Sequence, residues 1–272
     1  MPTETREWLA DSYGIRKAAS EHSVRSVPAA ELLHVPLLRE WIDEITASIR
    51  GQDRTAAAVR IAGSFGGVAL ALQAAMSVRD TAPDLCLPNL AADLNAGSGK
   101  LKVEFRPVTW SETPSPAGPS DARARPEWRD TALRSFYGHA RSLIEALAEA
   151  GGVNAGLLWG QWPARFHNAI NQLMLETDDS LLRRQLEEDY LFLRSGLPPQ
   201  EIFGRARNPF DVPVKPVEDL TVPGRQVALK SSCCLNYRTE GGVYCYRCPR
   251  LTEAERAERR QSYRLKAGIA EG

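Results

Sequence analysis

The sequence is poor in the residues and patterns on which many enzymes and nucleic-acid-binding proteins depend. Only four of its 272 residues are histidine, and no hydrolytic motif is recognisable. Lys and Arg together number 34, as do Asp and Glu, so the formal net charge is zero. A strongly basic nucleic-acid-binding protein is therefore disfavoured, and we expect no nucleic-acid partner.

Long apolar runs are also missing. The longest, around residues 56–76, is interrupted by Arg60 and Gln73, so no stretch of about 18 uncharged apolar residues remains. We therefore expect no transmembrane segment. The first seven residues mix acidic and basic side chains with no apolar segment behind them, so no secretory signal is expected. These absences predict a cytoplasmic protein, with peripheral association at the inner membrane face as an alternative.

The glycine-rich segments do not fit a nucleotide-binding loop. A dinucleotide-binding G-x-G-x-x-G follows a strand and opens a helix, whereas residues 63–67 read Gly-Ser-Phe-Gly-Gly within an apolar segment. Residues 97–100 read Gly-Ser-Gly-Lys and lack the Walker spacing. We expect no bound nucleotide, so any redox chemistry here would depend on an electron donor from outside the chain.

Apolar residues make up 43% of the chain, which is enough for a sizeable core. Their spacing predicts amphipathic or buried helices over residues 29–50, 54–78, 129–150 and 178–194. Thr252 and Glu255 form a capping box that opens a last helix, ending near residue 266. Glycines within residues 54–78 weaken that helix or allow close backbone packing.

Strand signals are few. Residues 101–105 alternate between apolar and polar, which predicts a strand or hairpin with its turn at residues 95–99. Proline-rich residues 111–127 predict a loop and a candidate lid, and residues 196–224 predict an extended connector. The prediction is an α+β fold with a mainly helical body and a small β-sheet.

The cysteines are few but unevenly placed. Four of the five lie within 16 residues near the C-terminus, namely Cys233, Cys234, Cys245 and Cys248. In an intracellular protein, such a cluster is typical of metal binding rather than of a disulfide framework. Cys86 stands alone between two leucines, where a buried apolar side chain is expected.

Four thiolates suit either a Cys₄ zinc site or a [2Fe–2S] cluster. Structural zinc sites usually have two pairs of spaced cysteines, so the adjacent Cys233 and Cys234 make a poor zinc knuckle. They can still supply ligands to a binuclear cluster. The spacing favours iron–sulfur, with structural zinc and redox dithiols as alternatives. Candidate hydrogen-bond donors to the sulfurs are Ser231, Ser232, Asn236 and Thr239.

The C-C-x10-C-x2-C motif at the C-terminal end resembles that of the FhuF-like family of ferric-siderophore reductases. Residues 157–161, Leu-Leu-Trp-Gly-Gln, are also similar to a mid-chain Leu-Trp-Gly-Asn type motif of that family, with Gln161 at the Asn position. The resemblance implies a [2Fe–2S] cluster on the four cysteines. It also implies reduction of an imported ferric siderophore in the cytoplasm, which releases the iron.

The coordination chemistry agrees with that implication. Fe³⁺ binds hydroxamate or catecholate oxygens tightly, whereas Fe²⁺ binds them weakly and exchanges fast, so a single electron releases the metal. A [2Fe–2S] cluster is a one-electron donor with a tunable potential, and no acid, base or nucleophile is required. The expected partners are a hydroxamate-type ferric siderophore and an external electron donor such as a ferredoxin or a flavin reductase.

Aromatic and cationic side chains are candidates for contacting the chelate. Aromatic rings suit chelate rims and arginines suit anionic groups, which makes candidate substrate-binding residues of Trp159, Trp162, Arg165, Arg238 and Arg247. The alternative is that the tryptophans belong to the core. Residues 225–266 carry ten Lys or Arg residues against four Glu residues. This predicts either a basic rim around the cluster or a solvated final helix.

The sequence thus divides into a mainly helical siderophore-binding body, residues 1–224, and a [2Fe–2S]-binding segment, residues 225–272. The expected activity is ferric-siderophore reduction. Two other functions remain open. One is a non-enzymatic iron–sulfur electron carrier or sensor, which would show no preference for siderophores. The other is a zinc-stabilised interaction module, which metal content would reveal.

Overall fold

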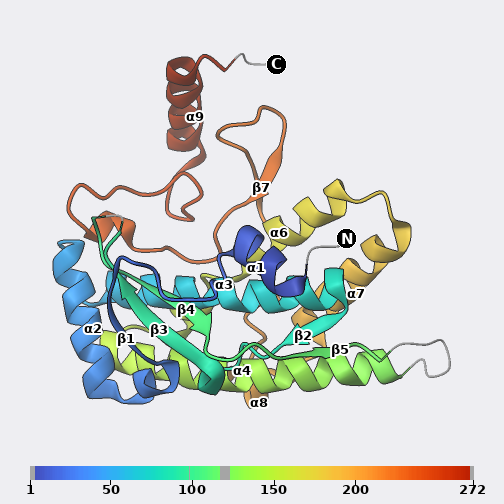
Figure 1. Cartoon of the computed structure of the whole chain (residues 1–272). Coiled ribbons are helices and arrows are strands. Elements are labelled where there is room, and N and C mark those ends of the chain that lie inside the picture. The colour runs from blue at the N-terminus through green and yellow to red at the C-terminus, as the bar shows by residue number, and fades with distance from the viewer. Residues whose placement is uncertain (1–3, 98, 117–122, 270–272) are drawn as a thin grey trace.

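The computed structural model describes residues 4–97, 99–116 and 123–269. It has 55% helix and 12% strand, which confirms the predicted α+β fold with a mainly helical body. Two long helices form the centre, α3 (Thr55–Arg79) and α4 (Ala124–Gly151), and they pack against each other and against α2 (Val35–Ser48). Figure 1 shows this helical centre with the C-terminal segment standing to one side of it.

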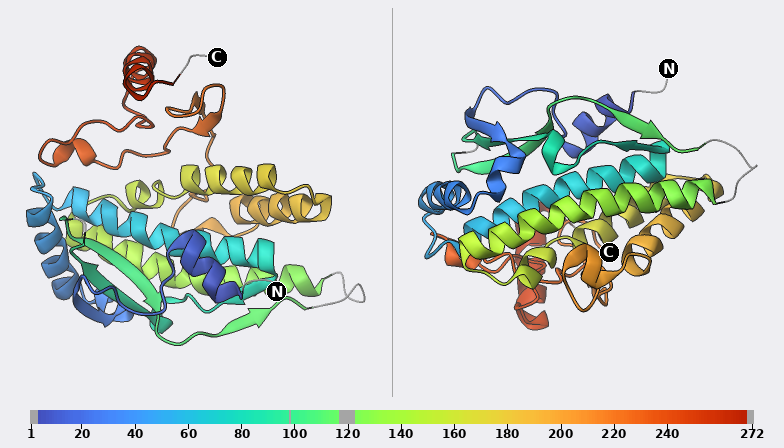
Figure 2. Two further views of the ribbon diagram at one scale, coloured as in Figure 1. Left: turned by 45° about the horizontal axis from the view of Figure 1, so that its top comes forward. Right: turned by 90° about the horizontal axis from the view of Figure 1, so that it is seen from below.

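A small antiparallel sheet covers one face of the central helices (Figure 2). Its strand order is β1-β3-β4, with β1 (Ser23–Pro28), β3 (Leu90–Asn95) and β4 (Lys102–Pro107). The hairpin predicted around residues 95–99 is therefore confirmed. Beside the sheet lie α1 (Thr5–Tyr13), the short pair β2 (Thr81–Pro83) and β5 (Glu112–Pro114), and the 3₁₀ turns η1 (Ala29–Leu33) and η2 (Leu87–Asn89).

The remaining helices lie on the other side of α3 and α4 (Figure 2). They are α5 (Ala155–Trp159), α6 (Pro163–Glu176), α7 (Ser180–Ser195) and α8 (Pro199–Phe203). The chain then forms a two-stranded hairpin, β6 (Pro216–Glu218) with β7 (Gln226–Ala228). This hairpin crosses residue 224, where the sequence suggested a boundary. The cysteine segment follows, with η3 (Asn236–Arg238) and α9 (Glu253–Ala267).

The predicted helices are confirmed, with shifted ends. The segment predicted from residue 29 begins as the turn η1, and α2 starts beside Pro36, which sits in its first turn. Asp179 caps α7 through the backbone N–H groups of Leu181 and Leu182. The capping box at the start of α9 is formed on both sides, by Thr252 and Glu255.

The prediction of an unbroken connector over residues 196–224 is wrong, because it contains α8 and β6. Pro199 is the first residue of α8. At that position a backbone N–H has no carbonyl partner within the helix, so the missing N–H of proline costs no helical hydrogen bond. In the predicted loop 111–127, β5 and the first turn of α4 are ordered elements. Residues 117–122, where the lid prediction falls, lie outside the described residues.

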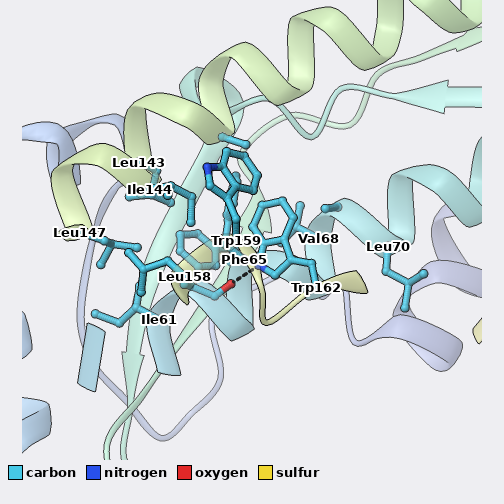
Figure 3. Close-up of a cluster of buried hydrophobic side chains, with 14 of the residues drawn as sticks. Ile61, Phe65, Val68, Leu70, Leu143, Ile144, Leu147, Leu158, Trp159 and Trp162 are labelled. Atoms are coloured by element: carbon cyan, nitrogen blue, oxygen red, sulfur yellow. Dashed lines mark hydrogen bonds between the residues drawn. The ribbon is translucent and has the colours of Figure 1, made fainter. Parts of the chain in front are cut away.

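Helix α3 is buried on all sides rather than along one stripe. It is long and apolar enough to cross a membrane by length and composition, but 83% of its apolar window is buried inside the protein. That burial is what the core helix of a soluble protein shows. Close packing depends on Gly66, because a Cβ atom there would lie 2.6 Å from the Trp162 ring. The Trp162 indole in turn donates to the Ala62 carbonyl at 2.8 Å (Figure 3).

Candidate metal centre

The four C-terminal cysteines come together in the structure as two pairs. The Sγ atoms of Cys233 and Cys248 are 3.5 Å apart, and those of Cys234 and Cys245 are 3.9 Å apart. All four thiols are free, and both separations are far longer than a disulfide bond of about 2.05 Å. The adjacent residues Cys233 and Cys234 thus point to different partners, and each meets one cysteine of the C-x2-C pair.

The two pairs differ in their exposure to solvent. Cys233 and Cys248 are buried, whereas Cys234 and Cys245 are half-buried. The pKa of Cys245 is raised by the proximity of both Cys234 and Cys248, so the pairs lie close enough to interact electrostatically. We call Cys233 and Cys248 the inner pair, and Cys234 and Cys245 the outer pair.

The spacing within each pair fits two ligands of one tetrahedral metal. Two thiolates with metal–sulfur bonds of about 2.3 Å in tetrahedral geometry lie about 3.8 Å apart. Both observed separations are close to that value. Within the described part of the chain, no three Cys, His, Asp or Glu side chains are grouped as ligands of one ion. The two short contacts join the four sulfurs as two pairs.

Lys230 lies against the outer pair. It is one of the ten basic residues of the predicted basic rim, although the sequence did not single it out. Burial alone would lower the pKa of its ammonium group, but charge attraction and hydrogen bonding from the Cys234 and Cys245 sulfurs outweigh burial and raise that pKa. A hydrogen bond from the Cys245 thiol lowers the pKa of Cys234 to about 4, and Lys230 adds to this effect. For the same reason the pKa of Cys245 is raised, since its proton is held between the two sulfurs. The outer pair is thus prepared to carry negative charge.

Backbone N–H groups, rather than the predicted side chains, donate to the sulfurs. Leu235 N–H donates to Cys233 and Asn236 N–H to Cys234. The hydroxyl of Ser232 instead donates to the Leu157 carbonyl at 2.9 Å. Of the other three predicted donors, Thr239 bonds to the Asn236 carbonyl, Asn236 bonds to the Val243 carbonyl, and Ser231 is exposed.

The loop between the cysteines is folded tightly enough to require glycine. A Cβ atom at Gly242 would lie 1.9 Å from the Asn236 carbonyl oxygen, and Gly241 has φ of +65°. Leu235, directly after the Cys233-Cys234 dipeptide, is itself left-handed at φ +55°. That turn aims the backbone N–H groups of residues 235 and 236 toward the two sulfurs.

Gln161 joins the helical body to the cysteine loop. Its side-chain amide donates to Ser232 Oγ at 2.6 Å, to the Cys233 carbonyl at 3.3 Å and to the Leu157 carbonyl at 2.9 Å. Gly160, the preceding residue, lies so close to Ser232 that a Cβ atom would be 2.7 Å from its hydroxyl. Residues 157–161 thus reach the inner pair, through the hydrogen bond from the Gln161 amide to the Cys233 carbonyl.

The predicted substrate residues are not brought together. Trp159 and Trp162 are 1% and 0% exposed and pack edge to face in the core, with ring centroids 4.8 Å apart and an interplanar angle of 73°, so neither is available to a ligand (Figure 3). Arg165 lies on the solvent side of α6 and donates to the Gly63 carbonyl. Arg238 pairs with Asp53 at the start of α3.

Arg247 is the exception among these five predicted residues. It lines a cavity that also includes Cys245 and Lys230. Its guanidinium makes no ion pair with any residue that the structure describes, unlike that of Arg238. Arg247 is therefore the predicted substrate residue that lies free beside the cysteine sulfurs.

Most of helix α9 is exposed to solvent, in keeping with the solvated-helix alternative, but two arginines on one of its faces are buried. Arg256 is 2% exposed and donates to the carbonyls of Tyr246, Cys248 (3.4 Å) and Leu251 (3.0 Å). Arg264, 4% exposed, pairs with Glu218 of β6 at 2.8 Å. The helix therefore holds the cysteine loop and the β6–β7 hairpin through its arginines. The sequence does contain a signal for these contacts, because arginines at residues 256, 260 and 264 lie on one face of a helix.

A scan against protein-family models finds no match to this chain, and no curated protein matches it.

Proposed function

We propose that this protein is a ferric-siderophore reductase that carries a [2Fe–2S] cluster on Cys233, Cys234, Cys245 and Cys248. The observation that carries the proposal is the arrangement of the four sulfurs as two pairs, each with the spacing of two thiolates on one tetrahedral iron. In this arrangement Cys233 and Cys248 would hold one iron, and Cys234 and Cys245 would hold the other.

The surroundings of the sulfurs support this assignment. The inner pair is buried, and the backbone N–H groups of residues 235 and 236 donate to the sulfurs of Cys233 and Cys234. The Lys230 ammonium group beside the outer pair stabilises added negative charge. Hydrogen bonds and charges of this kind raise the reduction potential of a cluster.

The cluster would supply one electron to the ferric ion of a bound siderophore, which leaves as Fe²⁺, and an external one-electron donor such as a ferredoxin or a flavin reductase would reload it. The chain's own residues position the ligands, exclude water from the inner pair and offer a surface for the chelate. We place this activity in the cytoplasm, where the reduced donor is present, with the inner membrane face as a peripheral location. The substrate that we propose is a hydroxamate-type chelate.

The test is anaerobic purification, followed by metal analysis and electron paramagnetic resonance (EPR) after dithionite reduction. We expect about two irons per chain and the signal of a reduced [2Fe–2S] cluster. The reduced protein is then mixed with a ferric trihydroxamate under an inert atmosphere, and reoxidation of the cluster is followed by its absorbance. One Fe²⁺ should appear, trapped by a ferrous chelator, for each cluster reoxidised.

Serine variants supply the matched controls. Each of Cys233→Ser, Cys234→Ser, Cys245→Ser and Cys248→Ser should lose or strongly perturb the cluster. Cys86→Ser should keep normal iron content, because the Cys86 thiol is half-buried against the core and bonds to Ser135. About one zinc and no iron per chain would replace the proposal with a zinc-stabilised interaction module. A cluster that ferric chelates do not reoxidise would point instead to an electron carrier or sensor.

A further inference from the structure

A cavity of about 530 Å³ opens directly beside the outer sulfur pair. Three segments far apart in the sequence enclose it: helix α6, the β6–β7 hairpin and the cysteine loop. Its wall includes the sulfur-bearing Cys245 together with Lys230 and Arg247. The volume lies in the range of pockets that hold drug-sized organic ligands, about 300–1,000 Å³.

We propose that this cavity is the binding site for the ferric chelate, which would place the metal complex against the exposed side of the cluster. The inference rests on the proposed function and identifies where its substrate binds. Of the two sulfur pairs, only the outer one is half-exposed, and its member Cys245 forms part of the cavity wall. A ligand in this cavity would therefore lie beside Cys245, one of the proposed cluster ligands.

The wall has the composition that a hydroxamate chelate requires. Its amide side chains can donate to hydroxamate and amide oxygens, and they come from both sides of the cavity: Asn168, Asn171, Gln172 and Gln226. Apolar groups complete the wall and suit the methylene linkers of such a ligand: Leu175, Leu220, Val227 and the ring of Tyr246.

The walls are held in place before any ligand binds. The Ala228 backbone N–H donates to Asn168 Oδ1 at 2.7 Å, which ties β7 to α6. Asp219 accepts from Arg225 at 2.6 Å and from the backbone N–H of Thr221 at 2.7 Å, which fixes the turn of the hairpin. A preformed site loses less entropy on binding than a mobile one.

Charge in the cavity is balanced except at Arg247. Arg225 is paired with Asp219, and Lys230 faces the outer sulfurs. The Arg247 guanidinium has no acidic partner in the described part of the chain, so it is available to a carboxylate or a carbonyl oxygen of the ligand. Among the described residues that line the cavity, Arg247 is thus the cation with no acidic partner.

The experiment measures binding rather than electron transfer. The probe is the gallium(III) complex of a linear trihydroxamate, which has the shape and charge of the ferric complex but accepts no electron from the cluster. Its dissociation constant is measured by calorimetry on the cluster-loaded protein. Gln172→Trp fills the cavity from α6, where the native side chain is exposed and bonds only to Glu176. Gln226→Trp fills it from the hairpin.

We expect both tryptophan variants to weaken binding at least tenfold while the visible spectrum and iron content of the cluster stay unchanged. Gln200→Trp is the matched control, because Gln200 is also an exposed glutamine on a helix but lies on α8, away from the cavity. It should bind as the unmodified protein does. If one cavity variant fails to retain its cluster, the other decides the question from the opposite wall.

Failure of this inference is distinguishable from failure of the proposed function. If the unmodified protein binds the gallium complex and both cavity variants bind it equally well, the chelate binds elsewhere and only the site assignment is lost. If the cluster-loaded protein binds no trihydroxamate complex at all, the reductase proposal fails, and the site fails with it.

Discussion

Arg256 holds the cysteine loop closed, and replacing it by alanine should open that loop. The side chain is 2% exposed and donates to three backbone carbonyls, those of Tyr246, Cys248 and Leu251. Two of these carbonyls belong to the turn that carries Cys245 and Cys248, proposed ligands from the outer and inner pairs. Since the acceptors lie within a buried site, water cannot simply replace the lost donor.

The magnitude follows from the number of acceptors. A hydrogen bond from a charged donor contributes about 1.5–3 kcal/mol, and removing one member of a buried charged network costs about 3–5 kcal/mol. We expect Arg256→Ala to lower the opening free energy of the loop by about 4 kcal/mol. Helix propensity works in the opposite direction, because alanine is a better helix former than arginine. A measured loss would therefore come from the loop contacts.

Hydrogen–deuterium exchange on the cluster-loaded protein measures that free energy directly. The amides of Cys248 and Leu251 are suitable reporters, because each donates to a carbonyl within the same turn. They should exchange several hundredfold faster in Arg256→Ala, since about 1.4 kcal/mol is one factor of ten. The control, Lys266→Ala, removes an exposed charge from the same helix and should change exchange less than threefold. Equal exchange in both variants would refute the clamp.

Three further changes test other parts of the molecule. Lys230→Met removes the cation that would favour the reduced, more negative form of the proposed cluster. The midpoint potential in an EPR-monitored titration should therefore fall by about 60 mV, equivalent to about 1.4 kcal/mol. An unchanged potential would show that Lys230 does not stabilise the reduced cluster. Gly66→Ala should lower the free energy of unfolding in urea by about 2 kcal/mol, because the added Cβ would clash with Trp162. Gly63→Ala, which has open space around the added Cβ, should be neutral or stabilising. Equal effects of the two changes would contradict the close-packing argument. Burial alone would raise the pKa of the Asp189 carboxyl, but two arginines and a serine outweigh burial and lower it. The ionised carboxylate therefore stabilises the fold above about pH 4. This stabilisation is lost as the pH falls through the lowered pKa. Asp189→Asn should cost about 3 kcal/mol at neutral pH and flatten the acid limb of the stability profile, and an unchanged acid limb would argue against the pairing.

Helices in this chain were predictable where burial follows a local pattern. Residues 129–150 alternate at helical spacing, and α4 buries that stripe against α2 and α3. Helix α8 and strand β6 were missed because their prolines suggested a connector. Pro199 in fact opens a helix, and β6 exists only because β7 pairs with it. The pairing of two strands eight residues apart cannot be predicted from the number of prolines in the segment.

The ligand set of the candidate centre followed from spacing, whereas its surroundings did not. Adjacent cysteines must project differently, and the structure places them in different pairs. The basic composition of residues 225–266 predicted cations near the sulfurs, but nothing in it singled out Lys230 among ten Lys and Arg residues. The two tryptophans illustrate the reverse error. Trp159 and Trp162 are large apolar side chains on helical segments, and the ordinary expectation of burial was the better guide.

One face of α9 relates the candidate cluster to the cavity beside it. Arg256 holds the cysteine loop, while Arg260 and Arg264 hold Glu218 of the hairpin at 3.3 and 2.8 Å. Residues spaced by four lie in a row along a helix, so a single rigid element sets the distance between the sulfurs and the hairpin wall. The tyrosine of the loop reinforces this link, because the Tyr246 hydroxyl donates to the Glu218 carbonyl at 2.6 Å. Because α9 contacts both the cysteine loop and the hairpin wall of the cavity, the distance between the sulfurs and that wall should change little when a cluster or a ligand binds. The proposed electron transfer to a bound ligand requires such a fixed distance.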